Sequence, residues 1–131
     1  MTAKQFRELA LGLPGVVEAA HMDHPDFRVG GRIFATLSSR EEEWGMVKVT
    51  PDQQAALLEA EPDVYTPASG AWGRQGCTMV RLRLARSGSV TASLLAAWRN
   101  TAPKRLLEKH PTVLEKLGGE ETDDTRRKRP A

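Results

Sequence analysis

Starting at residue 24, the chain reads His24-Pro25-Asp26-Phe27-Arg28-Val29-Gly30-Gly31-Arg32-Ile33-Phe34-Ala35. Two runs that contain β-forming residues flank Gly30-Gly31, and a glycine pair can supply the positive φ angles that a two-residue hairpin turn needs. Pro25 also restricts the residue before it to extended geometry. The stretch therefore predicts a β-hairpin with strands over residues 27–29 and 32–38.

A helix is predicted before this hairpin. Thr2 and Gln5 form a capping-box pair at its start. Apolar residues then recur at helical spacing, at Phe6, Leu9 and Leu13. The helix should end near Leu13, because Pro14-Gly15 follows it.

A third strand and a second helix are predicted after the hairpin. The strand covers residues 44–49, beyond a polar loop at 39–43. Thr50 is the expected N-cap, Pro51 takes the first helical position, where its missing N–H costs nothing, and Gln53 completes a second capping box. The buried stripe of this helix is predicted to contain Ala56, Leu57 and Ala60.

The second half of the chain predicts two more strands and a last helix. A short strand over residues 71–74 would pair with a longer one over 77–85 through Gln75-Gly76. The last helix begins near Ser89, and Pro103 should kink it or restart it near residue 102. The resulting order, α-β-β-β-α-β-β-α, is typical of an α+β domain in which helices cover one face of an antiparallel sheet.

Length and composition indicate one folded domain over residues 1–110. A chain of 131 residues can bury a core without disulfides, and Cys77 is its single cysteine. The N-terminus has no long apolar run, so we expect a cytoplasmic protein without a membrane span. Residues 111–131 are predicted to form a C-terminal extension that is largely disordered beyond 119.

Charge is distributed unevenly along the chain. The formal net charge is +2, but residues 1–73 contain six basic and eleven acidic residues, whereas residues 74–109, the basic block, contain eight basic residues and one acidic residue. A fold that gathers this block would concentrate positive potential on one surface, whereas a dispersed block would form an ordinary solvated face. The candidate nucleic-acid-binding residues are Arg74, Arg81, Arg83, Arg86, Arg99, Lys104 and Arg105.

Alternation in the predicted strand over 77–85 separates two sets of side chains. The set expected under the helices consists of Val80, Leu82 and Leu84. The set expected on the opposite, open face consists of Met79, Arg81 and Arg83. The third predicted strand would add to that open face Trp44, Met46 and Lys48. Such a face can stack bases and neutralise phosphates, or it can bury against another protein subunit.

The three tryptophans are expected in different environments. Trp98 shares helical spacing with Leu94 and Leu95, which favours the core. Trp72 lies between glycines and beside a basic residue, an arrangement that allows a partly exposed ring. Trp72 and Trp44 are the candidate stacking residues.

Metal and catalytic chemistry are not indicated. His21, Asp23, His24 and Asp26 are close in sequence, but their spacing matches no recognised ligand set, so no metal or cofactor is expected. The chain has no nucleophile-elbow, phosphate-loop or dinucleotide motif. Cys77 at a strand start fits a small packed residue better than a nucleophile. We therefore expect a protein that is not an enzyme.

Three local features together carry a family resemblance. They are the hairpin stretch itself, the Pro14-Gly15 helix stop, and the segment Ala97-Trp98-Arg99-Asn100-Thr101-Ala102-Pro103-Lys104-Arg105. In this combination the chain resembles the MmcQ/YjbR family of small bacterial proteins over about residues 1–110. The resemblance implies a two-layer fold with a five-stranded antiparallel sheet, similar to secretion chaperones and frataxin. It also implies DNA binding, and it brings no catalytic motif.

Two functional hypotheses follow. The leading one is a non-enzymatic DNA-binding protein that contacts phosphates through the basic block. The alternative is a homodimeric or partner-binding module, similar to a chaperone, that uses the open face of the sheet. Affinity for DNA that falls steeply with salt would favour the first hypothesis.

Overall fold

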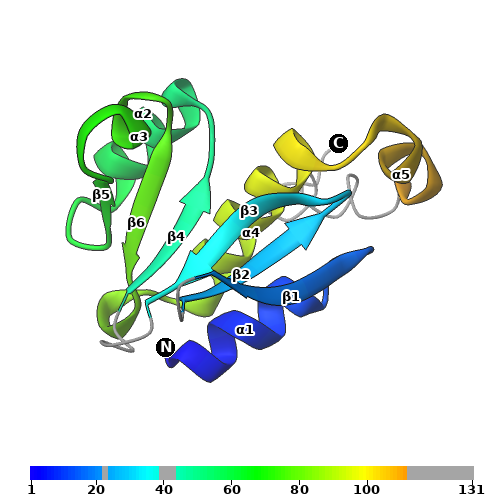
Figure 1. Ribbon diagram of the computed structural model, residues 1–131. Helices are drawn as coiled ribbons and strands as arrows, with labels where there is room; N and C mark the ends of the chain where they lie inside the picture. The colour runs from blue at the N-terminus through cyan, green and yellow to red at the C-terminus, as the bar shows by residue number, and fades with distance from the viewer. Residues whose placement is uncertain (22–23, 39–43, 112–131) are drawn as a thin grey trace, which may run out of the picture.

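A six-stranded antiparallel sheet organises the described part of the chain (Figure 1). The structure is a computed structural model that describes residues 1–21, 24–38 and 44–111. In their order across the sheet, the strands are β1 (Val16–His21), β2 (His24–Val29), β3 (Arg32–Leu37), β4 (Trp44–Lys48), β6 (Cys77–Arg81) and β5 (Tyr65–Pro67). The helices are α1 (Ala3–Leu11), α2 (Pro51–Ala60), α3 (Gly70–Arg74), α4 (Ser87–Thr101) and α5 (Lys104–Lys109), with a short 3-10 turn, η1 (Leu82–Leu84). The predicted α+β class is confirmed.

Local signals in the first half of the chain give the predicted elements. Strands β2 and β3 form the hairpin, with φ angles of 60° at Gly30 and 80° at Gly31. Both capping boxes are present, because the hydroxyls of Thr2 and Thr50 each accept a bond from a backbone N–H three residues later. These elements depend on neighbouring residues, so the sequence alone identifies them.

The predicted sheet of five strands is wrong: the sheet has six strands, and two of them, β1 and β5, were not predicted. In β1, only Val16 and Val17 favour a strand, whereas Glu18, Ala19 and Ala20 have weak strand propensity, so the pattern did not reveal it. Strand β1 pairs along its whole length with β2, from Val16 opposite Val29 to His21 opposite His24. Pairing with β2, rather than local preference, makes this segment a strand, and β1 becomes one edge of the sheet.

The predicted hairpin through Gln75-Gly76 is also wrong. Residues 70–74 form helix α3, and the antiparallel partner of β6 at this side is β5. The Gln54 side-chain amide donates to the carbonyl oxygens of Gly73 and Cys77, both at 3.1 Å, which ties α3 to α2. The order of elements is therefore α-β-β-β-β-α-β-α-β-α-α rather than the predicted one.

Strand β6 ends at Arg81, earlier than expected. Val80 and Leu82 are fully buried as predicted, but the chain turns into η1 and Leu84 is 51% exposed. The predicted position of Leu84 under the helices is therefore wrong. The alternation that assigns faces applies only as far as the strand extends.

Helices α1 and α4 pack against one face of the sheet and enclose the core. Phe6 of α1 lies over β4, so close that a Cβ on Gly45 would be 2.9 Å from its ring. Trp98 of α4 is fully buried, as predicted, and its indole N–H donates to the carbonyl of Pro14 at 2.9 Å. Among the described residues, no helix covers the opposite face of the sheet where Met46 of β4 and Met79 of β6 lie.

The remaining helices agree only partly with expectation. None of the residues in α2 is buried, so the predicted stripe is wrong: Leu57 is half-buried, whereas Ala56 and Ala60 are exposed. As expected, the last helix is interrupted at Pro103, where α4 gives way to α5. The expected disorder beyond residue 119 falls outside the described residues.

Candidate functional site

A row of side chains crosses the open face of the sheet. Residues that pair directly across neighbouring strands lie on the same face, because side chains alternate along each strand. The row runs over four strands through the pairs Thr36–Met46, Met46–Met79 and Met79–Thr66. Its centre is therefore a pair of methionines, Met46 on β4 and Met79 on β6.

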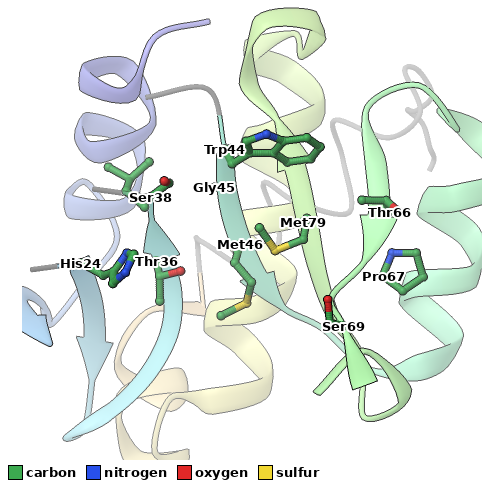
Figure 2. Close-up of a pocket in the computed structure, with 11 residues that line it drawn as sticks. His24, Thr36, Ser38, Trp44, Gly45, Met46, Thr66, Pro67, Ser69 and Met79 are labelled. Carbon is green, nitrogen blue, oxygen red and sulfur yellow. The ribbon is translucent and has the colours of Figure 1, made fainter. Parts of the chain in front are cut away.

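This row forms the floor of a cleft of about 550 Å³, which we call the open-face cleft. Figure 2 shows its lining side chains on one side of the strands. The lining residues come from five strands, from the residue after β3 and from the segment before α3, and they are His24, Thr36, Leu37, Ser38, Trp44, Gly45, Met46, Thr66, Pro67, Ser69 and Met79. Thioethers, an indole and a proline ring give the cleft an apolar surface, and hydroxyl groups add hydrogen-bonding atoms around it.

Trp44 closes one end of the cleft and is stacked with an arginine. The guanidinium carbon of Arg81 lies 4.8 Å from the centroid of the Trp44 ring, within the range of a cation–π contact. Trp44 and Arg81 are direct partners across β4 and β6. The predicted association of Trp44, Met46, Met79 and Arg81 on the open face is confirmed by these pairings.

The carboxylates of the strands are already paired with cations. The six strands contain two, Glu18 and Asp26, and these lie 3.1 Å from Arg7 and 2.8 Å from Arg28. The Asp26 side chain is buried, and its hydrogen bonds and charge raise the pKa of Arg28. Among the residues that the structure describes, no carboxylate lies within ion-pair distance of Arg81 or Lys48.

The structure does not gather the basic block into one surface. One group lies where β6 leads into α4 and consists of Arg81, Arg83 and Arg86. Another group lies at the far end of α4 and in α5 and consists of Arg99, Lys104 and Arg105. Because an α-helix rises 1.5 Å per residue, Arg86 and Arg99 are separated by about 20 Å along α4. Figure 1 shows α5 at the opposite end of α4 from β6, and Arg74 lies apart from both groups in α3.

The other candidate residues have separate positions. Trp72 on α3 is 64% exposed and does not line the open-face cleft. Cys77 is buried, and that burial raises the pKa of its thiol, so it is a packed residue as predicted. His24 lines the cleft, whereas the Asp26 carboxylate accepts two hydrogen bonds from the Arg28 guanidinium.

Chemically, the cleft is suited to binding. No group of His, Cys, Asp and Glu side chains able to hold a metal occurs in residues 1–21, 24–38 and 44–111. His24 is the one titratable side chain among the described residues that line the cleft. Elsewhere, Ser89 lies 2.5 Å from the Glu61 carboxylate and 2.6 Å from the Tyr65 hydroxyl, in a network that joins the first turn of α4 to β5.

Sequence reasoning missed the far wall of the cleft. Thr66, Pro67 and Ser69 belong to β5 and the segment before α3, where the sequence predicted only a loop. Strand β5 has only three residues, too few to show an alternating pattern. Its pairing with β6 is a long-range contact that the local sequence does not signal.

The fold and site define a two-layer α+β protein with an apolar cleft on one face of its sheet. The YjbR family model matches residues 11–102, and the chain belongs to this family. It is similar to the crystal structure of Deinococcus radiodurans protein DR2400, described with the domain name DUF419. That likeness has a TM-score of 0.67 and 19% sequence identity, covers 89% of this chain and 88% of the other, and shows the fold.

Two further findings concern the curated proteins and the helices. No curated protein matches its sequence. No helix in the described residues is long and apolar enough to cross a membrane.

Proposed function

We propose that the protein is a non-catalytic binding module that takes an extended segment of another protein chain in its open-face cleft. The observation that supports this proposal is the apolar floor formed by Met46 and Met79 across the uncovered face of β4 and β6. Methionine side chains are flexible and polarisable, so they adapt to different apolar partners. None of the described residues that line the cleft is a lysine or arginine, so the contact within the cleft itself favours an apolar side chain over a phosphate backbone.

The size of the cleft suits a short extended segment. Neighbouring strands are about 4.8 Å apart, so the row from Thr36 to Thr66 spans about 14 Å across the sheet. Along β4, the four residue steps from Trp44 to Lys48 span about 13 Å. A segment of about five residues in extended conformation covers this length.

Selection from a random peptide library tests this proposal. The full chain is immobilised and panned against phage-displayed random peptides, and the enriched peptides are then measured against variants. Met79→Glu places a charge on the cleft floor, and Thr66→Trp fills the cleft from an exposed position on β5. Leu84→Glu is the matched control, because Leu84 is exposed and outside the cleft.

The expected result is that enriched peptides bind the parent and Leu84→Glu equally but lose binding to both cleft variants. Circular dichroism checks that each variant is folded, and Thr66→Trp keeps the test decisive if Met79→Glu unfolds. Enrichment of no peptide, or binding that neither cleft variant weakens, would overturn the proposal. The proposal would also be overturned if sedimentation showed a dimer of the parent and Thr66→Trp dissociated that dimer, because a second copy of the chain would then occupy the cleft.

Nucleic acid is a second candidate partner. It is supported by the stacking of Arg81 on Trp44 and by Arg83 and Arg86, which follow within five residues at the same end of β6. Replacing Arg81, Arg83 and Arg86 by glutamine should weaken DNA binding across unrelated sequences and reduce the salt slope by about one unit per lost phosphate contact. The control replaces Arg99, Lys104 and Arg105, which lie at the other end of α4. Equal effects of the two triple variants, or no DNA binding at low salt, would reject this candidate.

A further inference from the structure

The open-face cleft lies between two cations. Arg81 is at one end, stacked on Trp44, and Lys48 is at the other end of β4, opposite Cys77 on β6. By alternation, Trp44, Met46 and Lys48 lie on the same face of β4. The face therefore presents a cation, an apolar methionine pair and a second cation in line along the two strands.

The spacing of these groups is set by the strands. Arg81 pairs with Trp44, and Lys48 lies four residues further along β4, so the two cations are separated by about 13 Å along the direction of the strands. In an extended peptide, residues four positions apart are separated by the same distance, and they project to the same side as the residue midway between them. The spacing of the two cations thus matches the span of a five-residue extended segment, from its first residue to its fifth.

The charge balance of this face favours a negative partner. Both carboxylates of the strands are engaged by Arg7 and Arg28. Within the described residues, no carboxylate is at ion-pair distance from Arg81 or Lys48. Within the described part of the chain, the charge of these two cations is therefore not neutralised by a carboxylate.

We infer that the cleft recognises an extended acidic peptide in which two carboxylate side chains, four positions apart, flank a central apolar residue. The apolar side chain packs on Met46 and Met79, and the carboxylates pair with Arg81 and Lys48. This inference rests on the proposed function and specifies the chemistry of its partner. A nucleic acid fits less well, because its phosphates need several closely spaced cations, whereas here an apolar floor separates two.

The test compares the parent with Arg81→Gln/Lys48→Gln in the same random-peptide selection. Peptides enriched on the parent should contain an apolar residue with Asp or Glu two positions before it and again two positions after it. The double variant should not enrich peptides with this pattern. Synthetic peptides containing Glu-Ser-Leu-Ser-Glu are then titrated while the tryptophan fluorescence of the protein, to which Trp44 contributes, is followed. The controls contain Gln-Ser-Leu-Ser-Gln, and Ser-Glu-Leu-Glu-Ser, which has the same composition with the wrong spacing.

The acidic peptide should bind about tenfold more tightly than either control, because each exposed ion pair contributes a few-fold in affinity. Arg81→Gln and Lys48→Gln should each weaken it roughly threefold, whereas Arg105→Gln on the distant α5 should leave affinity unchanged. Enrichment of peptides without paired acidic residues, or equal binding of the glutamine peptide, would overturn the inference and leave the proposed function standing. Enrichment of no peptide would reject both.

A last arm replaces the peptide by a labelled oligothymidylate. Weaker binding of this probe than of the acidic peptide is expected. Tighter binding that depends on both Arg81 and Lys48 would overturn the inference and identify the face as a nucleic-acid platform.

Discussion

Replacing Gly45 with alanine tests how helix α1 determines the position of the strand that carries Trp44 and Met46. A Cβ at this position would lie 2.9 Å from one ring atom of Phe6 and 3.1 Å from another. Carbon atoms pack at about 3.5–4.0 Å, so the ring or β4 must move by roughly half an ångström or more. Such overpacking in a well-packed core typically costs about 1–3 kcal/mol.

A double-mutant cycle isolates this contact. Phe6→Leu removes the ring edge and should cost about 1–2 kcal/mol alone, less than the roughly 3–5 kcal/mol of full truncation to alanine. If the ring causes the clash, Gly45→Ala adds little in the Phe6→Leu background, and the two losses should fall short of additivity by at least about 0.5 kcal/mol. Urea unfolding followed by tryptophan fluorescence gives the free energies of unfolding.

A matched control is available in α4. Gly88 is exposed, and nothing lies within 4 Å of a Cβ added there. Gly88→Ala should therefore stabilise the protein by about 0.5–1 kcal/mol, because alanine loses less backbone entropy in a helix. Full additivity of Gly45→Ala and Phe6→Leu, or a Gly45→Ala variant as stable as the parent, would refute the proposed contact.

Three further outcomes are expected. Trp98→Phe should lower the free energy of unfolding by about 1–3 kcal/mol, because it leaves the half-buried carbonyl of Pro14 without its indole donor. An unchanged urea midpoint would contradict this role of Trp98. Thr50→Ala should cost about 1 kcal/mol through loss of the α2 N-cap, measured in the same assay, whereas Thr66→Ala, which caps no helix, should cost less. Cys77 should react with iodoacetamide much more slowly in the folded protein than in urea, because its thiol is buried. Burial also raises the pKa of this thiol, so the rate in the folded protein should rise only at pH values above those at which the unfolded thiol ionises. Equal rates in both states would exclude this burial.

Parts of the fold and site are encoded by neighbouring residues. The Gly30-Gly31 turn, the two capping boxes and the helix break at Pro103 each follow from residues a few positions apart. The open-face positions of Trp44, Met46, Met79 and Arg81 follow from the period of two within single strands. Turns, caps and strand faces are short-range properties, so a single sequence contains the information for them.

Other parts depend on contacts between distant residues. Strands β1 and β5 have weak or short patterns and exist because β2 and β6 pair with them, and β5 supplies the far wall of the cleft. Leu84 leaves the core because β6 ends in η1, although its sequence continues to alternate. The basic block, continuous along the chain, is divided by the length of α4, since a helix separates residues that sequence order places close together. Pairing, strand ends and surface charge are set by three-dimensional packing, and only the tertiary structure decided them.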